Sequence, residues 1–235
     1  MEVMNRKFPD NRVLAGIPAK ESQRLRTLLE PVILRFGQIL YEPGGVIRHV
    51  YFPVNCLISL LTAVDKRRTL EVGMVGSEGM TGMPFVLGMG VSGVRALVQG
   101  EGEALRIAAA PFQTEFDQNP CLRRALFRYT YALMAQISQT AACNRFHAAE
   151  ARLARWLLMT RERIGSDEFP LTQEFLAHML GLRREGIAEA AGALKKRRLI
   201  AYSRGKIQIL NATALKASSC SCYGIVKKVY QRALS

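Results

Sequence analysis

The chain of 235 residues is long enough for one large domain or two small ones, and its 49% hydrophobic and 22% charged residues are typical of a folded protein. This composition argues against global disorder. Lys and Arg number 33 against 19 Asp and Glu, a formal net charge of +14, so we expect a polyanionic partner such as DNA, RNA or an anionic membrane surface.

Targeting and membrane segments are not predicted. Residues 1–10 lack the apolar core of a secretory signal peptide, and the longest apolar stretch, about residues 56–64, is shorter than the ~20 residues that cross a bilayer. The five cysteines are an odd number and too few for a disulfide framework in a chain of this length. We therefore expect reduced thiols and a cytoplasmic protein.

No metal site is predicted either. The three histidines lie far apart in the sequence, and Cys220 and Cys222 form an isolated C-x-C pair. A structural zinc site needs four ligands, and this pair supplies two.

The positive charge is concentrated in the C-terminal part of the chain. Residues 1–144 hold 16 Lys and Arg against 12 Asp and Glu, a net charge of +4. Residues 145–235 hold 17 against 7, a net charge of +10. This asymmetry predicts a polyanion-binding C-terminal module that follows a nearly balanced N-terminal one.

The N-terminal half is predicted to be a short helix followed by strands. Residues 19–29 have the apolar spacing of an amphipathic helix. From residue 33 to about 107, short apolar runs alternate with Gly and Pro, which is typical of a barrel, jelly roll or sandwich. Gly88, Gly90 and Gly93 match G-x-G-x-x-G, but strand-like residues follow, whereas a dinucleotide site opens a helix.

A long helix is predicted over residues 120–146, which contain no Gly and have Pro only at the start. Leu126, Tyr129, Leu133 and Ile137 follow a roughly heptad spacing. The helix is either part of the core or pairs with its twin in a homodimer, and its length favours dimerisation through these four residues.

Two further helices and a turn are predicted from residue 173 to 192. Ala177 is small where the helices would cross, and Gly181 tolerates the positive φ of the turn. Thr172 is placed to cap the first helix. These features indicate a helix-turn-helix, with an ordinary helical hairpin as the alternative.

The residues after this motif favour DNA binding. Residues 195–198 are all basic, and residues 199–203 and 206–210 read as two strands joined at Arg204 and Gly205, which makes the motif a winged helix. The second helix starts with Arg183, Arg184 and Glu185, and residues at this end of a recognition helix reach base edges.

In this order of parts the chain resembles the Crp/Fnr family of bacterial transcription regulators. The resemblance implies an α+β fold: a double-stranded β-helix (jelly roll) in residues 1–118, a dimerisation helix in 119–146, and a winged helix-turn-helix in 147–235. It implies a homodimeric, cytoplasmic regulator that binds double-stranded DNA, with RNA polymerase as a further candidate partner. No cofactor is assigned, and an unidentified small-molecule effector stays a candidate ligand.

The resemblance also assigns roles to residues. Arg184 and Glu185, with Arg183, would read bases, and Glu189 stands where the best-known members have a base-reading Arg, so the operator should differ. The expected phosphate contacts are Thr172, Lys195, Arg204 and Lys206. The expected effector pocket contains Gly79, Met80, Ser92 and Arg95.

Met80 and Ser92 replace the Glu and Arg with which family members bind cyclic nucleotides, so cyclic AMP binding of the usual kind is not expected. Two other functions fit the sequence less well. An enzyme on a cupin-like roll would need clustered histidines, and the roll has only His49. A cyclic-nucleotide-responsive module without DNA binding does not account for the basic winged helix.

Overall fold

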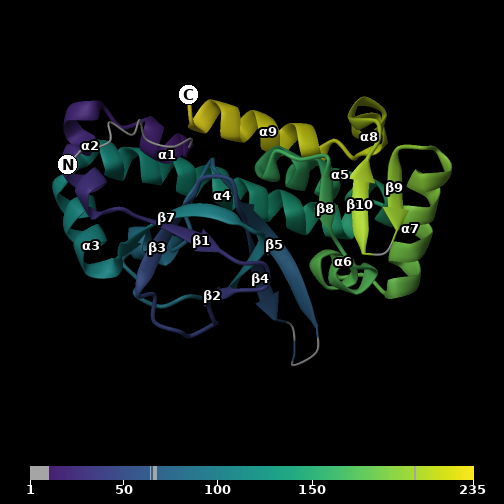
Figure 1. The fold of residues 1–235 in the computed structure, drawn as a ribbon, viewed down its shortest axis with the longest axis horizontal. Helices are drawn as coiled ribbons and strands as arrows, with labels where there is room; N and C mark the ends of the chain where they lie inside the picture. Colours follow the sequence, from purple (N-terminus) through teal and green to yellow (C-terminus); the bar gives the residue numbers. More distant parts are fainter. Residues whose placement is uncertain (1–10, 64, 66–67, 204) are drawn as a thin grey trace.

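The computed structural model describes residues 11–63, 65, 68–203 and 205–235. Among them, the strands between residues 30 and 108 form two antiparallel sheets, ordered β1-β7-β3 and β2-β6-β4-β5 (Figure 1). The predicted α+β class and the β-roll are therefore confirmed. The strands are β1 (Glu30–Leu34), β2 (Ile39–Tyr41), β3 (His49–Pro53), β4 (Leu57–Ala63), β5 (Thr69–Val75), β6 (Arg95–Gly100) and β7 (Gly102–Ala108).

The strand β4 has no simple alternation of polar and apolar residues because both of its faces are covered. The five successive residues 57–61 are all buried. The interior of the roll covers one face, while α5 contacts β4 and α4 contacts the neighbouring strand β5 on the outer side. A strand buried on both faces reads as a continuous apolar run.

Helical segments precede, interrupt and follow the strands of the roll. Gly88, Gly90 and Gly93 lie between η1 and β6, so a strand and not a helix follows them, as predicted. The helical segments of this half are α1 (Arg12–Ala15), α2 (Ala19–Leu28), the 3-10 helix η1 (Met83–Leu87), α3 (Ala109–Gln118) and α4 (Pro120–Phe146).

The helix α4 spans the 27 residues predicted from the sequence. It begins where the Asn119 Oδ1 accepts a hydrogen bond from the Leu122 amide at 2.9 Å, with Pro120 at the first helical position. It ends at His147, whose extended backbone breaks the helix before α5 begins.

The prediction that Leu126, Tyr129, Leu133 and Ile137 form a dimer seam on α4 is wrong. Leu126 and Tyr129 are completely buried and Leu133 is 5% exposed within a single protomer. Leu133 and Ile137 both pack against Gly73 of β5. This stripe is the core face of the helix, because the β-roll and not a second copy covers it.

A different face of α4 is exposed. Its members recur at intervals of four and three residues, the spacing of a coiled-coil seam, and its N-terminal half is apolar. Phe127, Tyr131 and Met134 are 51%, 65% and 61% exposed. The whole stripe consists of Phe127, Tyr131, Met134, Ser138, Ala141 and Arg145.

The C-terminal part is a winged helix with two helices after it. The three strands form an antiparallel sheet in the order β8-β10-β9, and α9 returns along α4 toward the roll (Figure 1). The sequence analysis did not predict β8, α8 or α9. None of the described helices is long and apolar enough to cross a bilayer. The elements are α5 (Ala149–Ile164), β8 (Glu168–Pro170), α6 (Gln173–Leu180), α7 (Arg184–Lys196), β9 (Ile200–Ser203), β10 (Lys206–Ile209), α8 (Ala212–Ser218) and α9 (Cys222–Ala233).

A buried carboxyl group joins the roll to α5. The Trp156 Nε1 donates to the Glu71 Oε1 at 2.9 Å, and the Ser59 Oγ donates to the Glu71 Oε2 at 2.6 Å. Burial raises the pKa of Glu71 to about 7, against the opposing effect of the hydrogen bonds from Ser59 and Trp156. The charged form of Glu71 is therefore disfavoured at this junction.

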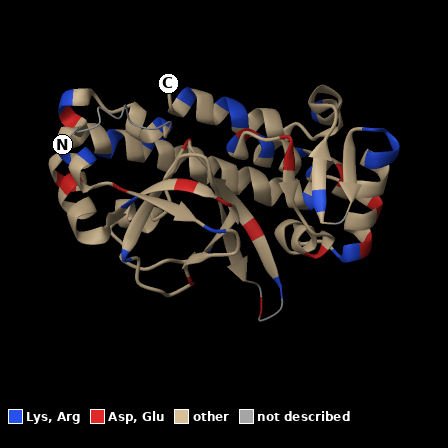
Figure 2. Cartoon of the chain, in the orientation of Figure 1, with Lys and Arg blue, Asp and Glu red and all other residues tan. Residues whose placement is uncertain are grey.

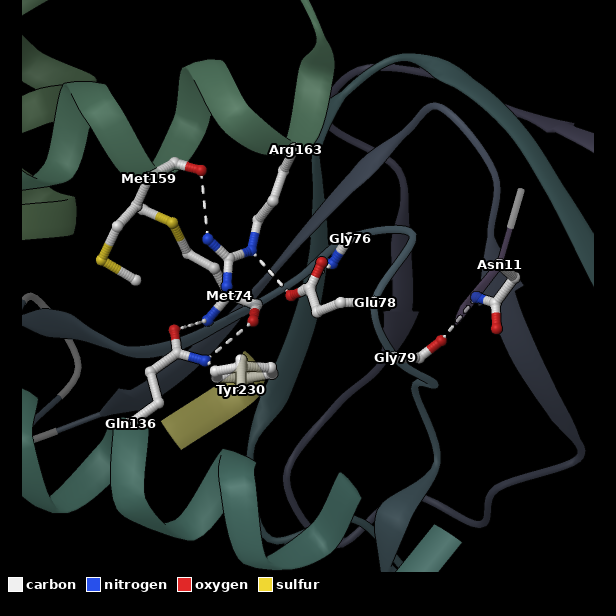
Figure 3. A network of polar contacts seen from close by, with 9 residues as sticks. All are labelled: Asn11, Met74, Gly76, Glu78, Gly79, Gln136, Met159, Arg163 and Tyr230. Carbon is white, nitrogen blue, oxygen red and sulfur yellow. Dashed lines mark hydrogen bonds and ion pairs between the residues drawn. The ribbon is translucent and has the colours of Figure 1, made fainter. Parts of the chain in front are cut away.

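A second polar network connects four elements (Figure 3). The Gln136 side chain of α4 exchanges hydrogen bonds with the Met74 backbone of β5 at 3.0 and 3.1 Å and donates to the Tyr230 hydroxyl of α9 at 2.7 Å. Nearby, Arg163 of α5 pairs with Glu78 at 2.8 Å, and both side chains are nearly buried. The roll, the long helix, α5 and α9 are thus fastened by hydrogen-bonded groups.

The tight packing of the loop before η1 on α4 yields a prediction. A Cβ added at Gly79 would lie 2.2 Å from the buried Tyr129 ring, whereas one added at Gly90 would meet nothing within 4 Å. We expect Gly79→Ala to destabilise the fold by about 3 kcal/mol, because overpacking forces a buried ring to move. Gly90→Ala is the matched control. Equal urea midpoints for the two variants would contradict this packing.

The junction at Glu71 predicts a pH-dependent stability. Its pKa is higher in the folded than in the unfolded chain, so its contribution to stability is present below about pH 4.5 and is lost as the pH rises to about 7. Glu71→Gln stays neutral, so relative to wild type its free energy of unfolding should increase by roughly 2–3 kcal/mol between pH 5 and pH 8.

Urea titrations at the two pH values measure this difference, and the fluorescence of Trp156, the one tryptophan in the chain, follows the junction directly. In wild type the emission should change with a midpoint near pH 7, and in Glu71→Gln it should not. A pH-independent stability difference would mean that Glu71 is charged when folded.

Candidate nucleic-acid interface

The helix-turn-helix is formed by α6 and α7. The Thr172 Oγ1 accepts a hydrogen bond from the Phe175 amide at 3.1 Å and caps α6, as predicted. Gly181 ends α6 with φ of +59°, the left-handed conformation that the turn requires. The second helix begins at Arg184, with Arg183 as its N-cap residue.

Apolar side chains fix the angle between the two helices. Leu176, Ile187 and Leu194 are fully buried, and Ala177 and Ala190 are small where the helices approach each other. Arg152 of α5 donates to the Leu180 carbonyl at the end of α6. The first helix of the winged domain therefore supports the turn directly.

Four charged side chains at the start of α7 are free to meet a ligand. Arg183, Arg184, Glu185 and, one turn later, Glu189 are all exposed. In the described part of the chain they make no hydrogen bond or ion pair with one another or with neighbouring side chains. Figure 2 shows basic positions at both ends of α7 and acidic ones along its side.

The residues predicted to contact phosphate do not form one cluster. Lys195 is exposed at the far end of α7, roughly 16 Å of helix away from Arg184. Lys206 begins β10 and pairs with Glu168 of β8 at 3.1 Å, both of them exposed, and Thr172 lies at the start of α6. Arg204 is outside the described residues.

The turn of the motif also faces the β-roll. A groove of about 700 Å³ separates the start of α7 from the beginning of β5, with Arg68, Thr69 and Leu70 on the roll side. A Cβ at Gly181 would lie 2.7 Å from the Leu70 side chain. In this conformation the N-terminal end of α7 opens onto the roll.

The residues of the expected effector pocket are already buried or in contact with other groups of the protein. Met80 is completely buried, and the Gly79 carbonyl accepts a hydrogen bond from Asn11 (Figure 3), while the Tyr129 ring fills the space over the loop. The Ser92 Oγ donates to the Val94 carbonyl at 2.7 Å, and Arg95 pairs with Glu42 at 2.9 Å on the surface.

A cavity of about 240 Å³ lies elsewhere, between the roll, α5 and α9. Sequence reasoning missed it because its walls come from segments far apart in the chain. Its charged lining residues are Arg12, Glu78, Glu162, Arg163 and Lys227.

The prediction that the chain has no metal-ligating cluster is also corrected. Cys143, His147, Cys220 and Cys222 meet where α4 ends and α9 begins, with one potential ligand atom from each lying within 4.8 Å of the others. The spacing of 73 residues between the two pairs concealed this cluster in the sequence.

Comparison with known proteins agrees with this architecture. Residues 151–218 match the family model of the Crp-like helix-turn-helix domain. A CRP-family transcriptional regulator from Thermus thermophilus superposes with a TM-score of 0.67 at 17% identity, covering 80% of this chain and 96% of its own. No curated protein matches the sequence.

Two further solved structures are similar over most of their length. The c-di-GMP-responsive regulator CLP of Xanthomonas campestris has a TM-score of 0.67 at 16% identity, with 82% of this chain and 99% of its own covered. FixK2 of Bradyrhizobium japonicum has a TM-score of 0.65 at 13% identity, with 82% of this chain and 98% of its own covered. The chain has the fold of the Crp/Fnr transcription regulators, and its residues 151–218 form a Crp-like helix-turn-helix domain.

Proposed function

We propose that this chain is a homodimeric, sequence-specific DNA-binding transcriptional regulator. The observation that carries the proposal is the exposed group of Arg183, Arg184 and Glu185 at the start of the second helix of a Crp-like helix-turn-helix. Arg presents paired donors to guanine O6 and N7, and Glu accepts from cytosine N4. Proteins of similar structure are described as transcriptional regulators, which supports a non-enzymatic role.

The proposed contacts fall into two classes. Arg183, Arg184, Glu185 and Glu189 would meet base edges, where a carboxylate at position 189 selects against a guanine contact there. Thr172, Lys195, Arg204 and Lys206 would meet phosphates. The groove between α7 and β5 supports a further step, in which the winged helix moves relative to the roll so that DNA reaches the start of α7.

The proposed domain boundaries are residues 1–118, 119–146 and 147–235. Dimerisation is proposed through α4, on the exposed stripe from Phe127 to Arg145 in place of the buried one. The four-three spacing of the stripe and its three large exposed apolar side chains support the pairing of two copies along α4. RNA polymerase is a proposed further partner, and cyclic AMP is not proposed as the effector.

DNA binding should respond differently to the two classes of residue. Arg184→Ala should cost about 1–3 kcal/mol on the selected cognate site and little on scrambled DNA, because it removes a base contact. Lys206→Ala should weaken binding to both DNAs alike and reduce the salt dependence by about one charge per half-site.

Binding of each variant to cognate and scrambled DNA across a salt series measures both effects, with half-sites about 10 bp apart or a multiple of this. Lys216→Ala, at an exposed lysine of α8, is the matched control and should change neither. If Arg184→Ala lost equal affinity on both DNAs, Arg184 would be a backbone contact. If wild type did not prefer any sequence, a sensor module without specific DNA binding would replace this proposal.

The dimer should depend on the exposed face of α4. Tyr131→Glu combined with Met134→Glu places like charges opposite each other in the seam, so the variant should sediment as a monomer at concentrations where wild type is a dimer. Both positions are exposed in the protomer, so its fold should persist in circular dichroism. Thr114→Glu, on the exposed surface of α3, is the control and should remain dimeric. A dimeric double variant would exclude this face.

A further inference from the structure

Four side chains with metal-binding atoms converge at the end of α4. Cys143 and His147 are one helical turn apart, and Cys220 and Cys222 lie at the start of α9. The three cysteines are at most 8% exposed, and His147 is partly exposed. All five cysteines of the chain are free thiols in the structure.

The distances within this cluster match those of a single tetrahedral ion. Zinc binds sulfur at about 2.3 Å and nitrogen at about 2.0–2.1 Å, so adjacent ligand atoms in a tetrahedral site are roughly 3.5–3.8 Å apart. The Cys143 and Cys220 Sγ atoms are 3.5 Å apart, and the Cys222 Sγ is 3.5 Å from the His147 Nδ1. The ligand atoms all lie within 4.8 Å of one another, which leaves no space for the inorganic core of an iron–sulfur cluster.

Groups around the cluster suit a set of bound thiolates. The Gln139 Nε2 donates to the Cys222 Sγ at 3.1 Å, as an outer hydrogen bond to a metal-bound sulfur would. The buried guanidinium groups of Arg152 and Arg155 interact electrostatically with Cys143. Three thiolates and one Zn²⁺ carry a net charge of −1, which neighbouring cations stabilise. The Nε atoms of both arginines are buried without a hydrogen-bond partner among the described residues.

We propose that Cys143, His147, Cys220 and Cys222 bind one Zn²⁺ ion as a closed Cys₃His site. The ion would tie the end of α4 to the start of α9. His147 is also the residue between α4 and α5, so the same ion would fix the link through which the winged helix leaves the long helix. The proposal does not depend on DNA binding, and its chemistry is ligand exchange in which the thiols release their protons on binding.

The main alternative to a bound ion is a disulfide between Cys143 and Cys220, whose sulfur atoms are 3.5 Å apart. A disulfide would use neither His147 nor Cys222. The two arrangements therefore predict different effects of substituting these two residues.

The test uses the full-length chain without an affinity tag, reduced, stripped of metal with a chelator and then dialysed against Zn²⁺. Elemental analysis should find about one zinc per chain. Cys222→Ser and His147→Ala should each lose most of this zinc. Cys121→Ser, at a partly exposed cysteine outside the cluster, and His178→Gln, at an exposed histidine, are the matched controls and should retain it.

Substitution with Co²⁺ gives an independent reading of the ligands, because tetrahedral thiolate coordination produces strong visible and near-ultraviolet absorption. Wild type and the two controls should show these bands, and Cys222→Ser should show them weakened or absent. Thermal unfolding should shift to lower temperature when zinc is removed and recover when it is restored.

Three results would overturn the proposal. One is a wild-type protein that binds less than about a tenth of an equivalent of zinc under reducing conditions. Another is unchanged zinc binding in Cys222→Ser and His147→Ala. The third is a non-reduced protein in which mass spectrometry finds Cys143 and Cys220 joined and no metal bound. If a variant does not fold, the cobalt spectrum and zinc content of wild type alone still decide the first result.

Discussion

The packing of one face of α4 against the β-roll is the constraint on which the rest of the structure depends. β5 lies at the edge of the four-stranded sheet. Its unpaired backbone groups would otherwise need hydrogen bonds from water or from another strand. Gln136 satisfies the Met74 amide and carbonyl together, and its amide also holds the Tyr230 hydroxyl. One side chain of α4 therefore pairs with the sheet edge at Met74 and contacts α9.

This packing also determines which surface of α4 is left for a partner. Tyr129 and Leu133 fill the roll side, so the exposed stripe that begins at Phe127 is what a second copy would meet. Periodicity predicted the helix and its boundaries because helix-forming residues recur without interruption between Asn119 and His147. Periodicity could not predict which stripe is buried, because α4 carries two stripes with apolar residues. Only the tertiary fold determines which of them the roll covers.

Features that depend on local sequence could be predicted, whereas features that depend on contacts between distant segments could not. The helix-turn-helix could be located because its requirements are local: a cap at Thr172, a left-handed turn at Gly181 and small residues between the helices. The packing around Gly79 and Met80 could not be predicted, because it depends on Tyr129, which is about fifty residues away in the sequence. The cysteine and histidine cluster was missed for the same reason, as its two halves meet only when α9 returns along α4.

The link between the two parts of the chain is where these contacts concentrate. Glu71 and Trp156 join the roll to α5, Arg163 joins α5 to the loop at Glu78, and the cluster around His147 surrounds the residue where α4 gives way to α5. At the Glu71 contact the charge depends on proton binding near neutral pH, because burial raises the pKa of this carboxyl group to about 7. A purely hydrophobic joint would not respond to pH, whereas the hydrogen-bonded joint at Glu71 should weaken as the pH rises toward 7. The groove between α7 and β5 is lined in part by Asn144 of α4 and Arg152 of α5, so it adjoins this same link.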